Sequence, residues 1–121
     1  KMAVQYWRYR GCPAKYRFVS LADAYHGDTT GAMEVGYVGW FAEHYGTMLH
    51  PCHALPSPHA QSSDRGTIED TCARAIEAAE VYIARHAKEL AAFIVEPLVQ
   101  GAAGVRIYPK EYLAAIRELC S

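Results

Sequence analysis

Two short segments combine residue types that bind small molecules. Residues 25–28 read Tyr-His-Gly-Asp and follow an apolar stretch, while Glu96 follows the apolar run 91–95 and precedes Pro97 and a loop that contains glycine. In open α/β sheets, binding groups gather in loops at the carboxyl ends of the strands. The two segments therefore have the composition of binding loops rather than of ordinary core.

Each segment also has a plainer interpretation. Tyr25 and His26 alone fit a half-buried aromatic pair at a strand end, and Glu-Pro is a common way to leave a strand with the glutamate in solvent. The neighbouring sequences, Asp-Thr-Thr-Gly-Ala-Met over 28–33 and Gln-Gly-Ala-Ala-Gly over 100–104, favour binding in both cases. Arg106 fits a carboxylate clamp or, as strand-end arginines more often do, a solvated surface side chain.

The elements that position these segments follow from hydrophobic periodicity. Helical spacing predicts a first helix over 1–10 that stops at Gly11, and a short helix over 27–35 that begins at the polar pair Asp28 and Thr29. The clearest helix begins at Thr67, and another begins at Pro109.

Strands are predicted between these helices. Residues 16–21 form one candidate, and the unbroken apolar run 91–95 is typical of a strand that is covered on both faces in a parallel sheet. Residues 39–63 hold no period and are interpreted as a long loop.

In order and separation, these segments resemble the class III aminotransferases that use pyridoxal phosphate. The resemblance covers nearly the whole chain and rests on Lys-Met-Ala and Gln-Tyr-Trp in the first helix, Arg17-Phe18, residues 25–29 and the Glu-Pro and Gln-Gly pairs. It implies an α/β fold, part of the large domain of a fold-type I transferase, with a mostly parallel sheet and helices on both faces. Residues 1–121 would be a fragment of that cofactor-binding domain, because the catalytic unit is several times longer and the first and last helices lack a cap and a stop signal.

The resemblance also implies a cofactor and its contacts. The cofactor is pyridoxal 5'-phosphate, with Tyr25, His26, Gly27 and Glu96 beside it, and Tyr25 and Asp28 also bordering the substrate pocket. The reaction is amino-group transfer between small-molecule substrates, in a homodimer. A class III transaminase acting on ω-amino acids or diamines, or a noncatalytic truncated fragment, remains an alternative.

No catalytic residue is expected within this chain. Its lysines are predicted on helix surfaces or in turns rather than in an apolar pocket that would lower a lysine pKa; they are Lys1, Lys15, Lys88 and Lys110. In the family, the cofactor-bonding lysine and the aspartate at the pyridine nitrogen come after residue 121, and the phosphate-binding turn precedes Lys1. The chain alone is therefore expected to be inactive.

Composition restricts partners and location. A net charge of −1 and a pI near 6.6 give no reason to expect nucleic acid or an anionic membrane as a partner. No apolar run is long enough to cross a bilayer, and the N-terminus has no export signal, so a cytoplasmic location is expected. The four cysteines form no CxxC pair, and Cys72 and Cys120 fall on apolar helix faces, which favours reduced thiols.

A histidine-rich stretch invites a metal interpretation. It supplies ligand types at His44, His50, Cys52, His53 and His59. Their spacing fits no compact zinc pattern, and no acidic partner lies close by to orient an imidazole. A loop over an active site or a subunit interface is the favoured interpretation, and no metal is expected.

Overall fold

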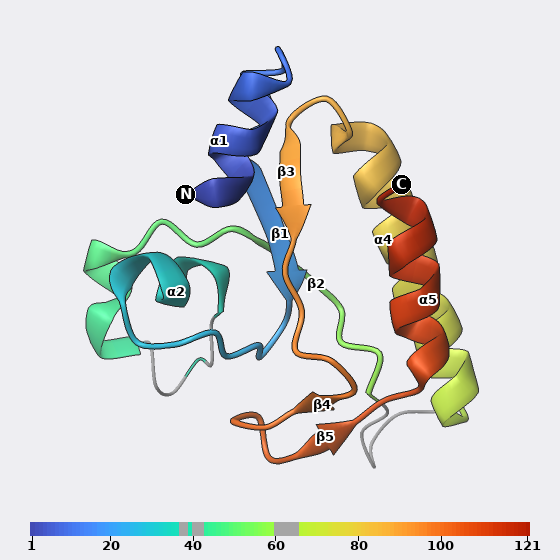
Figure 1. Cartoon of the computed structure of the whole chain (residues 1–121). Helices are drawn as coiled ribbons and strands as arrows, with labels where there is room; N and C mark the ends of the chain where they lie inside the picture. The colour runs from blue at the N-terminus through green and yellow to red at the C-terminus, as the bar shows by residue number, and fades with distance from the viewer. Residues whose placement is uncertain (37–38, 40–42, 60–65) are drawn as a thin grey trace.

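The computed structural model describes residues 1–36, 39, 43–59 and 66–121. In chain order, the elements are α1 (Met2–Tyr9), β1 (Arg17–Leu21), α2 (Thr30–Val35), a 3₁₀ helix η1 (Glu43–Met48), β2 (His53–Leu55), α4 (Ile68–His86), β3 (Leu90–Phe93), β4 (Val99–Gln100), β5 (Arg106–Ile107) and α5 (Lys110–Leu119) (Figure 1). All four predicted helices and both predicted strands are present.

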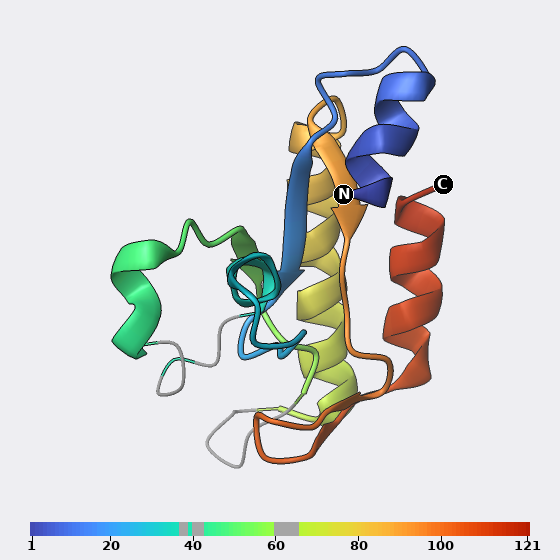
Figure 2. The ribbon, with the colours of Figure 1, turned by 60° about the vertical axis from the view of Figure 1, so that its left-hand side comes forward.

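The sheet is parallel, with β1 between β2 and β3. Val19 pairs with His53 on one side and with Phe93 on the other. Helix α4 connects β2 to β3, the kind of crossover that joins parallel strands of one sheet. The separate antiparallel pair β4–β5 forms a hairpin below the sheet, at the carboxyl ends of β1 and β3 (Figures 1 and 2). The predicted α/β fold is confirmed.

The prediction of a structureless loop over 39–63 is wrong in two places. Residues 43–48 form η1, and β2 at 53–55 adds a third strand to the sheet. Three residues are too few to show an alternating pattern, and β2 is stabilised by pairing with the distant β1 rather than by its own sequence. Residues 40–42 and 60–63 of the predicted loop lie outside the described residues.

The main core lies between the sheet and the helices α4 and α5. Val19 and Leu21 point from β1 into this core and are 0% and 1% exposed, and they are joined there by the fully buried Ala79 and Tyr112 of the two helices. Side chains alternate along a strand, so Ser20 points to the other face. These contacts anchor β1 as the central strand.

The other face of β1 is covered near its carboxyl end by α2. Ser20 lies there with its hydroxyl 3.3 Å from the thiol of Cys52, and the Cys52 backbone N–H donates to the carbonyl of Glu34 in α2 at 2.8 Å. Met33 of α2 and Leu49 form a second, smaller apolar cluster. Helices therefore lie on both faces of the sheet, as predicted.

Polar caps define where α2 and α4 begin. Thr29 accepts a hydrogen bond from the Ala32 N–H, so α2 starts directly after the predicted polar pair. Thr67 and Asp70 form a reciprocal capping box at the start of α4, with N–H to oxygen distances of 2.8 and 3.1 Å.

The cysteines follow the prediction in part. All four are free thiols, and Cys72 is buried in α4. Cys120 is exposed, so its placement on a buried helix face was wrong. It forms the C-cap of α5, where the helical pattern that predicted burial ends.

Candidate functional site

The carboxylate of Glu96 joins the two candidate binding segments. Its Oε1 accepts a hydrogen bond from the backbone N–H of Tyr25, and its Oε2 accepts one from the N–H of Gly101, both at 2.9 Å. The two segments meet because β1 and β3 are parallel neighbours, so their carboxyl ends lie at one edge of the sheet (Figure 1). The alternative of a merely solvated Glu96 is therefore wrong.

Tyr25 and Asp28 are also in contact. The Tyr25 hydroxyl donates to Asp28 Oδ1 at 3.0 Å, and this bond raises the pKa of Tyr25. Gly27 lies between them with a φ of +116°, a backbone conformation that side-chain-bearing residues rarely adopt. The Tyr25 residue is 37% exposed, so this bond forms at the surface of the site.

His26 is turned inward from the same loop. Its Nε2 is buried without a hydrogen-bond partner in the described part of the chain. Gly36, after α2, makes this packing possible, because a Cβ there would lie 2.9 Å from the His26 backbone nitrogen and 3.2 Å from its ring. Burial lowers the pKa of His26, and the charge of Glu96 opposes this shift.

This lowered pKa predicts a loss of stability in acid. The unfolded chain has a His26 pKa near 6.5 and binds the proton more readily than the folded chain. The His26 contribution to stability should therefore be complete above about pH 6.5 and should fall as the pH drops from there through the folded-state pKa. We expect His26→Gln to flatten this part of the pH profile of the urea midpoint.

The matched control is His44→Gln, because His44 is exposed on η1. Its profile between about pH 5 and 8 should overlay that of the unmodified protein. Equal slopes for His26→Gln and the unmodified protein would refute the assignment.

The β4–β5 hairpin holds the segment between β1 and Tyr25. Arg106 Nη1 lies 2.6 Å from Asp23 Oδ2, and Asp23 has a φ of +58°. The prediction that Arg106 is a solvated surface side chain is thus wrong. Asp23 was missed, because no sequence signal connects residues that are 83 positions apart.

Gln100 is the second missed contact of this hairpin. In the sequence, Gln100 stood out only as the first residue of the segment 100–104, whose composition favours binding. In the structure Gln100 ends β4 and is fully buried, with its amide bonded to Ala22 and Ser57, while the turn that follows it spans 101–104. The available sequence signal was a polar glutamine directly after the apolar residues Leu98 and Val99.

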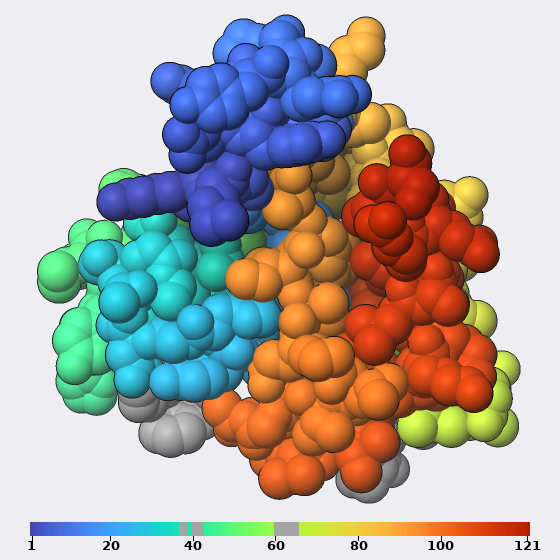
Figure 3. Space-filling view, in the orientation of Figure 1, coloured from blue at the N-terminus to red at the C-terminus, as the bar shows by residue number. Residues whose placement is uncertain are grey.

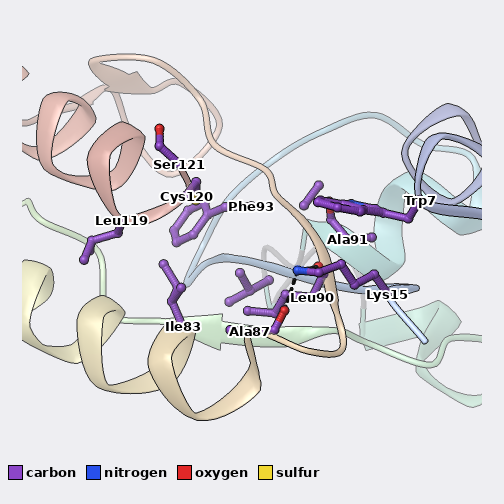
Figure 4. A pocket seen from close by; sticks show the side chains of 12 residues that line it. Trp7, Lys15, Ile83, Ala87, Leu90, Ala91, Phe93, Leu119, Cys120 and Ser121 are labelled. Carbon is purple, nitrogen blue, oxygen red and sulfur yellow. Dashed lines mark hydrogen bonds between the residues drawn. The ribbon is translucent and has the colours of Figure 1, made fainter. Parts of the chain in front are cut away.

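Lys15 lies away from this site. Lys15 precedes β1 at the opposite end of the sheet, where its ammonium donates to the carbonyls of Ala87 and Leu90 and lies 4.4 Å from the centre of the Trp7 ring (Figure 4). These residues border a groove of about 470 Å³, so Lys15 is less surface-exposed than predicted. The lysines Lys1, Lys88 and Lys110 are exposed.

The histidines of residues 44–59 make separate contacts. The His53 ring stacks on Tyr82 with 4.1 Å between ring centres, and His59 Nδ1 lies 3.2 Å from the Ile107 carbonyl oxygen. Within residues 1–36, 39, 43–59 and 66–121, no three His, Cys, Asp or Glu side chains gather as metal ligands.

In the described segments, no helix combines the length and apolar character needed to span a bilayer.

A parallel sheet with an aromatic ring and a carboxylate at its carboxyl edge is the arrangement in which open α/β proteins bind small molecules. The family Aminotransferase class-III matches residues 1–121, and the chain belongs to this family.

Individual relatives agree with this assignment. The chain is 40% identical over 124 residues to the adenosylmethionine-8-amino-7-oxononanoate aminotransferase of Geobacter sulfurreducens, covering 99% of this chain and 27% of the relative. Among solved structures, it is similar to a PLP-bound amine transaminase from an uncultivated Pseudomonas species, with a TM-score of 0.86, 38% identity and coverage of 98% and 27%.

A third comparison is with the adenosylmethionine-8-amino-7-oxononanoate aminotransferase of Methanocaldococcus jannaschii. The TM-score is 0.80 and the identity 28%, with 98% of this chain and 24% of that chain covered. The chain thus spans about a quarter of the length of these relatives.

Proposed function

We propose that this chain supplies part of the cofactor site of a pyridoxal-phosphate-dependent aminotransferase, within a longer protein. The observation that carries the proposal is the Glu96 carboxylate, which fastens the Tyr25 and Gly101 backbones to each other at the carboxyl edge of the sheet. This edge is where open α/β sheets bind ligands. The family of the chain and a PLP-bound structural relative support the choice of cofactor.

The residues present fit such a cofactor. Tyr25 carries an aromatic ring, 37% of the residue being exposed, and its hydroxyl is held by Asp28. A ring fixed at its outer end offers a face on which a flat heteroaromatic ring can stack. Gly27 bears no side chain that would obstruct this approach, and the buried His26 Nε2 has no partner within the described residues.

Each residue then has a role in the proposed site. Tyr25 stacks on the cofactor ring and, with Asp28, borders the substrate. Glu96 holds the Tyr25 loop in place, while His26 and Gly27 form the wall beside it. The bound cofactor supplies the electron sink for amino transfer.

The covalent anchor for the cofactor is proposed to come from outside this chain. Lys15 is engaged by two carbonyls and Trp7 at the opposite end of the sheet. The exposed Lys88 follows α4, and Lys110 begins α5. We therefore infer that the 121-residue chain alone does not catalyse amino transfer.

The proposed reaction is amino transfer from S-adenosylmethionine to 8-amino-7-oxononanoate, a step of biotin synthesis. This reaction is supported by two relatives at 40% identity that are named adenosylmethionine-8-amino-7-oxononanoate aminotransferase. The alternative is amino transfer from another amine, supported by the amine transaminase at 38% identity. A homodimer in the cytoplasm is proposed for the complete enzyme.

Donor preference tests the reaction. The complete protein, loaded with pyridoxal phosphate, is assayed with 8-amino-7-oxononanoate as acceptor and either S-adenosylmethionine or a simple primary amine as donor. We expect a higher kcat/KM for S-adenosylmethionine. Faster turnover of the simple amine supports the alternative, and no turnover with any donor contradicts the proposal.

Replacing Tyr25 with phenylalanine tests the site. The ring remains, so pyridoxal phosphate should still bind, whereas the bond to Asp28 is lost. The hydroxyl would then no longer hold Asp28, which borders the substrate in this proposal, so we expect kcat/KM to fall by roughly one to two decades.

A melting curve of each loaded variant accompanies the kinetics, and Tyr9→Phe on the exposed part of α1 is the control. An unchanged kcat/KM for Tyr25→Phe with a clear fall in Tm would assign Tyr25 to the core instead.

A further inference from the structure

Gln100 is a fully buried polar residue beside the candidate site. Its exposed fraction is 0%, although it ends a two-residue strand near the surface. The side-chain Nε2 donates to the carbonyl of Ala22 at 2.8 Å, and Oε1 accepts from the hydroxyl of Ser57 at 2.5 Å. One amide thus joins the exits of β1 and β2 to the hairpin.

The Ala22 carbonyl lies at the start of the turn that leads to Tyr25. The Ala22 N–H donates to the Leu55 carbonyl at 2.8 Å and ends the pairing with β2, and the Ala24 N–H donates back to Leu21 at 3.2 Å. Asp23, between them, has a φ of +58°. The orientation of the Ala22–Asp23 peptide therefore determines the direction in which the chain reaches Tyr25.

The chemistry of the contact calls for an amide. Ala22 presents an acceptor and Ser57 a donor, so the group between them must donate on one side and accept on the other. An apolar side chain of the same size deprives the Ala22 carbonyl of this donor and the Ser57 hydroxyl of this acceptor, and an ionised carboxylate cannot donate to Ala22.

We propose that Gln100 is a positioning residue that sets Tyr25 against Glu96 by fixing the Ala22 carbonyl. Its importance for cofactor binding rests on the function proposed above for Tyr25. Gln100 itself is buried beneath the loop and acts through the backbone. Figure 3 shows the segment from β3 to β5, which carries Glu96 and Gln100, running between α2 and α5.

Other contacts keep the surrounding structure in place when Gln100 is changed. Arg106 still pairs with Asp23, and the hydroxyl of Tyr108 still donates to the backbone carbonyl of Glu96. The hairpin and the end of β3 are thus held independently. A change at Gln100 should therefore loosen the Tyr25 loop without unfolding the protein.

Amide hydrogen exchange in the complete protein without cofactor tests the positioning directly. In Gln100→Met we expect the protection factor of the Tyr25 amide to fall about 10-fold, as for one lost buried hydrogen bond, and those of α4 to stay unchanged. Gln5→Met on the exposed face of α1 is the matched control. A folded Gln100→Met with an unchanged Tyr25 protection factor overturns the proposal.

A glutamate at this position provides a second, pH-dependent test. In Gln100→Glu, the protonated carboxyl can donate to Ala22, but the ionised form cannot. The Tyr25 protection factor should fall as the pH rises through the pKa of the new carboxyl. In the unmodified protein it should not fall as the pH rises, because loss of the proton from His26 stabilises the folded chain. Should Gln100→Met fail to fold, this comparison decides, and a pH-independent Tyr25 protection factor in Gln100→Glu overturns the proposal.

Titration with pyridoxal phosphate connects the positioning to function. We expect the Kd of Gln100→Met to rise about 10-fold and that of Gln5→Met to match the unmodified protein. A lower Tyr25 protection factor with an unchanged Kd refutes the role of Gln100 in cofactor binding. Failure of the unmodified protein to bind pyridoxal phosphate contradicts the proposed function instead, and leaves the exchange result on Gln100 unaffected.

Discussion

Replacing Glu96 with alanine should weaken the binding of pyridoxal phosphate by roughly two decades or more. The carboxylate accepts two backbone hydrogen bonds, from Tyr25 and Gly101, and each charge-assisted bond contributes about 1.5–3 kcal/mol. Without it, both N–H groups lose their partner and the two loops are no longer fastened together. The expected loss of about 3 kcal/mol corresponds to the two decades in Kd.

The measurement is a cofactor titration of the complete protein, with a melting curve of each apoprotein. Glu96→Gln keeps the size of the side chain but turns an NH₂ group toward one of the two N–H donors, so it should lose part of the affinity. Glu80→Gln, on the exposed face of α4, is the matched control. A Kd for Glu96→Ala within twofold of the unmodified value would show that the two hydrogen bonds accepted by Glu96 are not needed for cofactor binding.

The buried pair Tyr108 and Tyr112 predicts stability effects of opposite sign. The two rings meet edge to face, with centres 5.7 Å apart. The hydroxyl of Tyr108 donates to the Glu96 carbonyl, whereas that of Tyr112 is buried with no hydrogen-bond partner among the described residues, and burial raises its pKa. Removing the Tyr112 hydroxyl thus relieves an unpaired polar group.

We expect Tyr112→Phe to stabilise the protein by about 1 kcal/mol and Tyr108→Phe to destabilise it by about the same amount. Tyr112→Ala should destabilise it by about 3–5 kcal/mol, because the 0% exposed ring leaves a cavity between α4 and α5. The urea midpoints of the three variants give these values. A destabilised Tyr112→Phe would mean that the hydroxyl has a partner in the complete protein.

Elements with a repeating pattern were predictable from the sequence. The apolar stripe and the Thr67 cap identified α4, and the unbroken apolar run identified β3. Strand β2 has three residues and no pattern of its own. Strands β4 and β5 have two residues each and directly follow Leu98 and Val105, whose positive φ is not signalled by their residue type. These elements are determined by their partners.

The site, too, was predictable only in part. Residue type and strand position were enough to predict that Tyr25 and Glu96 lie at one edge of the sheet. The atoms they use were not predictable, because Glu96 binds backbone N–H groups, which every residue except proline possesses. The contacts of Gln100 with Ala22 and Ser57 likewise depend on three segments that meet only in the folded chain.

The bond from Tyr25 to Glu96 spans 71 positions of the chain, which affects how the protein is made. At about 5–20 residues per second, a ribosome delivers Glu96 roughly 4 to 14 s after Tyr25. During this interval β1 has emerged without β3, and its apolar residues Val19 and Leu21 lack most of their final cover. Nascent chains stalled before residue 90 should therefore bind chaperones through β1, and release should coincide with the emergence of β3 and α5.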